Sequence, residues 1–182
     1  MRGLTLHRPW PFTIFHLPAG SVPGPKRIEN RPMKPPSVAR GERIALHAGK
    51  KWDDNCGAYC RELGLTLPHQ HSAFPRERGN DPVVYCHPEA VIVGLVRVVG
   101  WVEGTPRMGN MPATVEAFSG ISVELARVLV NDPWFFGPFG WALEDVVTLP
   151  EPVPHTGAQG LWTVEPAAEA RVLAQLDKVA PR

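Results

Sequence analysis

Three charged side chains, Lys26, Glu29 and Arg31, lie close together near the amino end of this sequence. On an extended chain Glu29 and Arg31 point to the same face, and Lys26 follows a Pro-Gly-Pro turn from which it can reach that face. An ammonium and a guanidinium suit a phosphate or a base edge, and a carboxylate can accept from an exocyclic amine. The group predicts a basic cleft for a nucleotide-like ligand.

The same residues have two other interpretations. In an enzyme, a desolvated Lys26 would activate water or a ribose hydroxyl, Glu29 would move a proton, and Arg31 would hold the developing negative charge. In a structural role, Glu29 and Arg31 would form an ion pair at the mouth of the fold while Lys26 is simply solvated. The residue types alone leave open whether the chain is an enzyme.

Three further residues, Arg8, Trp10 and His47, are candidate ligand contacts. Trp10 can stack an unpaired base, and we prefer it among the aromatic residues because it lies at a strand end beside Arg8. His47 lies opposite the apolar side chains of its strand, where it either lines the cleft or is a satisfied structural histidine. The aromatic residues near glycines, of which we expect at least three in the core, are Trp10, Trp134, Phe135, Phe136 and Trp141.

A zinc site is a competing hypothesis. Its candidate ligands are Cys56, Cys60, His69, His71, Cys86 and His87. Their spacing matches no strong zinc pattern, and a buried cysteine in a helix is well explained as a small apolar residue. We therefore expect no metal and no other cofactor.

Composition places limits on the class of protein. The 182 residues, 43% of them hydrophobic, suit one domain spanning 1–182, and the net charge of +1 means that any nucleic-acid site must be local. Three cysteines make no disulfide framework, and about 18 consecutive apolar residues occur nowhere. We expect a cytoplasmic protein that does not interact with membranes.

The 21 prolines and 17 glycines leave short strand-like runs and favour a barrel or mixed fold over a helical bundle. Strands are expected at 3–7, 43–48 with one buried face, 90–101 with both faces buried, 141–149 and 160–164. Helices are expected at 12–17 after two prolines, at 53–64 with an aspartate cap, and from Pro166, whereas 122–130 suits helix or strand. Residues 65–89 read as a long loop insertion.

The run Gly24-Pro25-Lys26-Arg27-Ile28-Glu29-Asn30-Arg31 resembles the GxKxxExR signature of the ASCH family. Other elements agree in order: His7-Arg8-Pro9-Trp10 resembles the family's opening strand end, and the stretch from Arg40 to Ala48 its second strand. The stretch from Trp134 to Asp145 resembles its late Tyr-Gly-Trp strand, and Gly160-Leu161-Trp162 its last.

This resemblance implies an α+β fold, a PUA-like small β-barrel with flanking helices. It also implies a partner that is single-stranded RNA or a modified nucleoside, with DNA as an alternative, bound at Lys26, Glu29 and Arg31. Family members are RNA or DNA binders, ribonucleases, or amidohydrolases acting on acylated cytidine. In hydrolytic bacterial relatives the lysine is catalytic and threonine replaces the glutamate, so Glu29 departs from that pattern.

A third interpretation is a protein-interaction module. Its contact surface would be the proline-rich stretches 18–36 and 65–88. Loss of the Lys26 charge would then leave partner binding intact.

Overall fold

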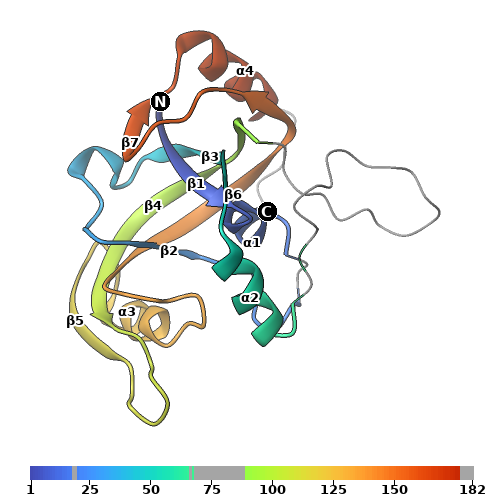
Figure 1. The fold of residues 1–182 in the computed structure, drawn as a ribbon. Coiled ribbons are helices and arrows are strands. Elements are labelled where there is room, and N and C mark those ends of the chain that lie inside the picture. Colours follow the sequence, from blue (N-terminus) through green and yellow to red (C-terminus); the bar gives the residue numbers. More distant parts are fainter. Residues whose placement is uncertain (18–19, 66, 68–88, 177–182) are drawn as a thin grey trace. The chain divides into compact units, whose positions relative to one another are not determined.

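A computed structural model describes residues 1–17, 20–65, 67 and 89–176, and shows the expected α+β class (Figure 1). The strands are β1 (Arg2–Arg8), β2 (Ile28–Arg31), β3 (Arg43–Trp52), β4 (Val91–Thr105), β5 (Thr114–Ser119), β6 (Phe139–Pro154) and β7 (Leu161–Thr163). The helices are α1 (Trp10–Phe15), α2 (Asp54–Glu62), α3 (Val123–Val130) and α4 (Pro166–Leu176), with a 3-10 turn η1 (Ser37–Ala39).

The strands form one sheet in the order β2-β6-β4-β3-β1-β7, with β5 also paired to β4. The expected central strand is confirmed: β4 lies inside this order, and its side chains from Val91 to Val96 are all buried. A run of β-branched residues without alternation is typical of a strand covered on both faces.

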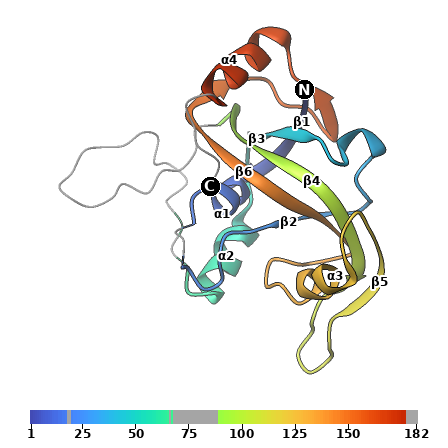
Figure 2. The ribbon, with the colours of Figure 1, turned by 180° about the vertical axis from the view of Figure 1, so that it is seen from behind.

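The described residues divide into two compact units. Unit 1 takes its residues from 1–25, 45–95 and 147–176, and unit 2 comprises 26–44 and 96–146. In unit 2, α3 packs against β5, as two opposite views show (Figure 1 and Figure 2). Ser122 caps α3 by accepting a hydrogen bond from the N–H of Leu125 at 3.2 Å, which resolves this segment as a helix.

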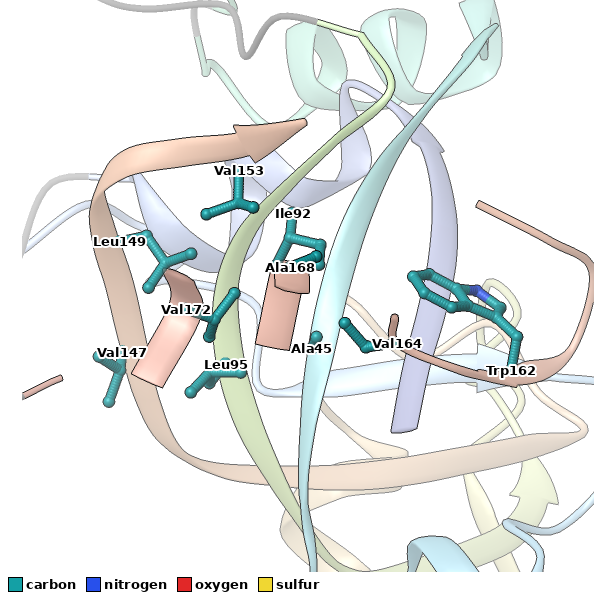
Figure 3. Packing of buried hydrophobic residues seen from close by; sticks show 10 residues of the cluster. All are labelled: Ala45, Ile92, Leu95, Val147, Leu149, Val153, Trp162, Val164, Ala168 and Val172. Atoms are coloured by element: carbon teal, nitrogen blue, oxygen red, sulfur yellow. The ribbon is translucent and has the colours of Figure 1, made fainter. Parts of the chain in front are cut away.

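The core of unit 1 joins buried residues of α4 to residues of β3, β4, β6 and β7 (Figure 3). Ala168 and Val172 of α4 belong to the same buried cluster as Ala45 of β3. The expectation of one buried face for β3 is therefore wrong, because residues 44–49 are all buried. Ala45 and His47 share one face, which is covered by the α4 cluster and by Trp162, whose ring lies edge-on to His47. Ile44 and Leu46, on the other face, are buried as well.

Helix α2 begins as predicted, because Asp53 accepts a hydrogen bond from the N–H of Asn55 at 3.1 Å. Helix α1 begins at Trp10, earlier than expected, since a proline such as Pro11 fits a first turn whose N–H groups need no partner. No helix among the described residues is long and apolar enough to cross a membrane. The predicted loop insertion at 65–89 lies almost wholly outside the described residues.

Two glycines of unit 1 should respond to alanine in opposite directions. A Cβ on Gly94 would collide with the ring of Phe15 and the carbonyl oxygen of Val147, whereas one on Gly57, inside α2, would make an ordinary contact at 3.7 Å. We expect Gly94→Ala to lower the free energy of unfolding by about 1–3 kcal/mol through overpacking, and Gly57→Ala to raise it by about 0.5–1 kcal/mol. Urea denaturation measures both, and equal effects would contradict the packing described.

Candidate functional site

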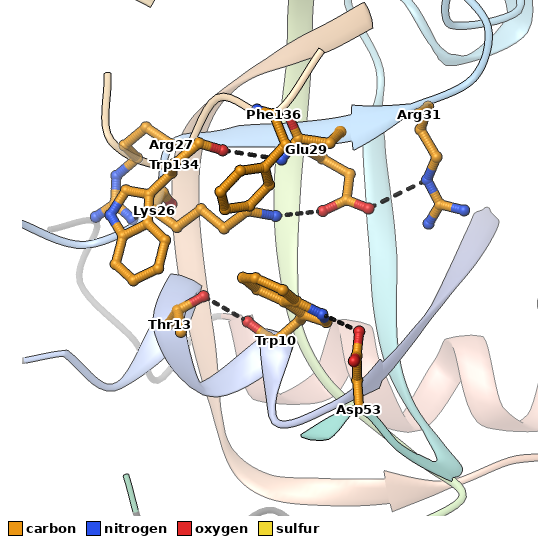
Figure 4. Close-up of polar contacts among 10 residues, drawn as sticks. Trp10, Thr13, Lys26, Arg27, Glu29, Arg31, Asp53, Trp134 and Phe136 are labelled. Atoms are coloured by element: carbon orange, nitrogen blue, oxygen red, sulfur yellow. Dashed lines mark hydrogen bonds and ion pairs between the residues drawn. The ribbon is translucent and has the colours of Figure 1, made fainter. Parts of the chain in front are cut away.

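Lys26, Glu29 and Arg31 meet in unit 2 as a chain of three charges (Figure 4). Lys26 Nζ lies 2.6 Å from Glu29 Oε2, and Arg31 Nε lies 3.1 Å from Glu29 Oε1. Only 2% of Lys26 and 6% of Glu29 is exposed. The interpretation of Lys26 as a solvated lysine is therefore wrong, whereas the ion pair between Glu29 and Arg31 is present.

Strand β2 positions these charges by pairing antiparallel with β6. The register sets Glu29 opposite Trp141 and Asn30 opposite Gly140. A Cβ on Gly140 would overlap the side chain of Ile28, so glycine is required where this fully buried side chain crosses β6. With Ile28 fixed on one face, the alternation of the strand directs Glu29 and Arg31 to the other.

Asn30 ties a second segment to β2. Its Nδ2 donates to the carbonyl oxygen of Trp134 at 2.8 Å, and its Oδ1 accepts from the N–H of Phe136, also at 2.8 Å. Trp134 is buried, whereas 39% of Phe136 is exposed. These two hydrogen bonds hold the backbone of the exposed Phe136 against Asn30, which lies between Glu29 and Arg31 on β2.

A second carboxylate interacts with Lys26. Burial raises the pKa of Asp132 above its usual range, while a hydrogen bond from the N–H of Trp134, at 2.7 Å, and the charge of Lys26 oppose the rise. Asp132 begins the segment that Asn30 holds. Lys26 therefore interacts with a carboxylate from β2 and with one from the stretch before β6.

Arg31 also lies against an aromatic ring. Its guanidinium carbon is 6.0 Å from the ring of Trp141, whose Nε1 donates to the carbonyl oxygen of Met33 at 2.8 Å. Arg31 keeps 23% of its side chain exposed, more than Lys26 or Glu29 does. The outermost group of the three is thus a guanidinium whose position is restrained by Glu29 and Trp141.

The other predicted contacts, Arg8, Trp10 and His47, belong to unit 1. Arg8 donates to the carbonyl oxygens of Gly49 and Lys50 and pairs with Glu89 at 2.9 Å. Nε1 of Trp10 donates to Asp53 Oδ2 at 2.8 Å (Figure 4). These contacts account for the two side chains within unit 1, and their contact with a ligand stays a prediction.

His47 lies in a network of hydrogen bonds. Its Nε2 donates to the carbonyl oxygen of His155 at 2.9 Å, so its Nδ1 is left to accept from Thr5 Oγ1 at 3.3 Å. Trp162 Nε1 in turn donates to Thr5 Oγ1 at 3.1 Å. Burial lowers the pKa of His47, the hydrogen bond to His155 opposes this, and the charge of His155 adds to it. These contacts support the structural interpretation of His47.

Sequence reasoning missed two residues of the site and undervalued a third. Asn30 and Asp132 were not singled out, because their roles depend on the pairing of β2 with β6. Phe136 was grouped with aromatic residues of which at least three were expected in the core, and Trp134, Phe135 and Trp141 are indeed buried. A signal was present in the Gly-Pro-x-Gly pattern that follows Phe136, which is typical of an exposed turn.

No group of three or more histidine, cysteine or acidic residues within the described ranges could hold a metal ion. Cys56 and Cys60 are buried in α2, where a hydrogen bond from Cys56 lowers the pKa of Cys60 against the effect of burial. The other four residues of the zinc hypothesis lie outside these ranges. No protein-family model matches the sequence, and a search of curated proteins found no match.

The stability of the protein should fall in mild acid because of His47. A histidine with a lowered folded pKa is protonated first in the unfolded chain, so its contribution is complete above about pH 6.5 and is lost as the pH falls toward the folded value. We expect urea denaturation between pH 8 and pH 5 to show this decline, and His47→Gln to reduce it. His7→Gln, at an exposed position, is the control, and an unchanged decline in His47→Gln would contradict the assignment.

Proposed function

We propose that this chain is an ASCH-type protein with a PUA-like small β-barrel, which binds single-stranded RNA or a modified nucleoside through Lys26, Glu29 and Arg31. The observation that carries the proposal is the chain of three charges, two of them buried, formed by Lys26 with Glu29 and Arg31 of β2. Asn30 of the same strand holds the backbone of the exposed Phe136. The resemblance of residues 24–31 to the GxKxxExR signature supports the same assignment.

Stability alone gives a weak reason for such a cluster. Removing an ammonium and a carboxylate from water costs several kcal/mol per ion, and well-packed apolar residues in their place are often equally or more stable. Charges held in this way occur often at functional sites, where their orientation matters more than their contribution to folding. Lys26, Glu29 and Asp132 fit that description, because each interacts with another charge of the cluster.

Each residue has a part that its environment suits. Arg31, the most exposed of the three, is suited to a phosphate or a base edge. Glu29, oriented by two cations, is suited to accept from an exocyclic amine. Phe136 offers an aromatic face on which a base can stack, with its backbone already fixed by Asn30.

Binding is favoured over catalysis by the state of Lys26. Its Nζ is in direct contact with Glu29, and an ammonium has no lone pair, so Lys26 would have to give up a proton before it could act as a general base. Ground-state binding needs no such step, since the ion pair itself orients Glu29. A hydrolase, acting on RNA or on an acylated cytidine, is the alternative that the same residues would support.

Phe136→Ala should weaken binding of a fluorescein-labelled 12-mer of uridine in an anisotropy titration. Loss of one base stack costs about 1–3 kcal/mol, so we expect the affinity to fall about 5- to 100-fold. Phe118→Ala is a matched control, since Phe118 is also in unit 2 and is 40% exposed. Equal affinities for the two variants would contradict stacking on Phe136.

Lys26→Met separates binding from catalysis. If the site binds, removal of this charge should lower the affinity for the 12-mer by at least about tenfold, because Glu29 loses a charge-assisted hydrogen bond. The far-ultraviolet circular dichroism of the variant checks that it folds, and Arg31→Gln tests the site at a more exposed position. Cleavage of RNA or of an acylated cytidine by the wild type, lost in Lys26→Met with binding retained, would overturn the binding assignment in favour of the hydrolase.

A further inference from the structure

The chain that follows Glu29 and Asn30 carries several exposed cations. This basic segment, residues 31–43, has four cations, at 31, 34, 40 and 43, and one carboxylate, Glu42. Lys34, Arg40 and Arg43 are exposed, and none of the three forms an ion pair with another described residue. Arg97, by contrast, is paired with both Glu144 and Asp145.

The basic segment is held in place at several points. Trp141 binds the carbonyl oxygen of Met33, and the N–H of Gly41 donates to the carbonyl oxygen of Val98 at 2.7 Å. Ala39, in η1, is completely buried. The backbone is therefore ordered between β2 and β3, and its cations are presented from a fixed base.

Two of the cations lie over tryptophan rings. Arg31 lies over Trp141, and Lys34 Nζ lies 4.9 Å from the centre of the Trp101 ring. A cation over an aromatic face keeps its charge accessible while its position is restrained. Arg40 pairs with Val98 of β4 through a β-bridge. Val98 precedes Trp101, the residue under Lys34, by three positions, so the two contact points on β4 are about 10 Å apart along the strand.

Exposed apolar side chains alternate with these cations. Met33 is 62% exposed and Val38 is 52% exposed, so the order along the segment is cation, apolar, cation, apolar, cation, cation. A single-stranded nucleic acid presents phosphates and unpaired base faces in alternation, and proteins that bind it combine cations with apolar or aromatic contacts. A membrane surface would be better matched by an amphipathic helix, whereas this segment contains only the three-residue η1.

We infer that the basic segment is a track for the sugar-phosphate backbone of single-stranded RNA that runs on from Arg31, so that the ligand is a strand of several nucleotides and not an isolated nucleoside. This inference rests on the proposed function and narrows it. Lys34, Arg40 and Arg43 contact phosphates, and Met33 and Val38 contact bases without selecting among them.

The test is a triple variant, Lys34→Gln, Arg40→Gln and Arg43→Gln, titrated with the labelled uridine 12-mer from 25 to 200 mM salt. For single strands the slope of log affinity against log salt is about 0.7 per phosphate contact, so we expect it to become shallower by about 2 and the affinity at low salt to fall at least about tenfold. The control variant, with the same change of charge, is Lys50→Gln, Lys51→Gln and Arg61→Gln, whose positions are exposed in unit 1. It should keep the wild-type slope.

Four outcomes would overturn the inference. If the triple variant keeps the wild-type slope, or if both variants lose slope equally, the basic segment makes no specific phosphate contacts although the proposed function can stand. If the segment instead drives sedimentation with vesicles containing phosphatidylserine while the triple variant still binds the 12-mer as the wild type does, its partner is a membrane. If the wild type binds neither the 12-mer nor an acylated cytidine, the proposed function itself fails. If the triple variant folds poorly, Arg40→Gln and Arg43→Gln are titrated singly, and each should make the salt slope shallower by about 0.7.

Discussion

The carboxylate of Glu29 is the group on which the site depends, because it is shared by cations that precede and follow it in the chain. Each of these charges is tolerable at low exposure only while the others are present. The arrangement in turn requires the register between β2 and β6, since a slip by one residue would turn Ile28 outward and Glu29 inward. The fit of Ile28 over Gly140 opposes such a slip, so apolar packing on one face of β2 maintains the polar geometry on the other.

Elements with strong local signals were predictable from the sequence. The aspartate before α2 and the uninterrupted apolar run of β4 are properties of a few adjacent residues, and both elements formed where expected. The burial of β3 was not predictable in the same way. Its polar-looking face is covered by Trp162, and the cluster around Ala45 is completed by α4, both of which come from the far end of the chain. Whether the sheet has the PUA-like form stays a prediction.

In the candidate site, too, the features that depend on neighbouring residues were predictable and those that depend on distant contacts were not. The spacing of Glu29 and Arg31 on an extended chain was enough to predict that they meet, since alternation is a local property of a strand. The burial of Lys26 and the approach of Asp132 follow from contacts between β2 and the stretch before β6, which no local pattern encodes. For His47, the sequence suggested a ligand contact or a structural histidine. Its hydrogen bonds with Thr5 and with the carbonyl oxygen of His155 support the structural role.

The double hydrogen bond of Asn30 fixes the path of the main chain at residues 134–136 independently of the side chain that position 136 carries. Asn30 contacts only main-chain atoms of the segment it holds, at Trp134 and Phe136. An amide can donate and accept at once, a requirement that aspartate or leucine at position 30 would not meet. The identity of the side chain at position 136 is under no such requirement. The shape of the segment is thus set by Asn30 and main-chain atoms, so a replacement of the side chain at position 136 changes the surface that the segment presents without removing either of these hydrogen bonds.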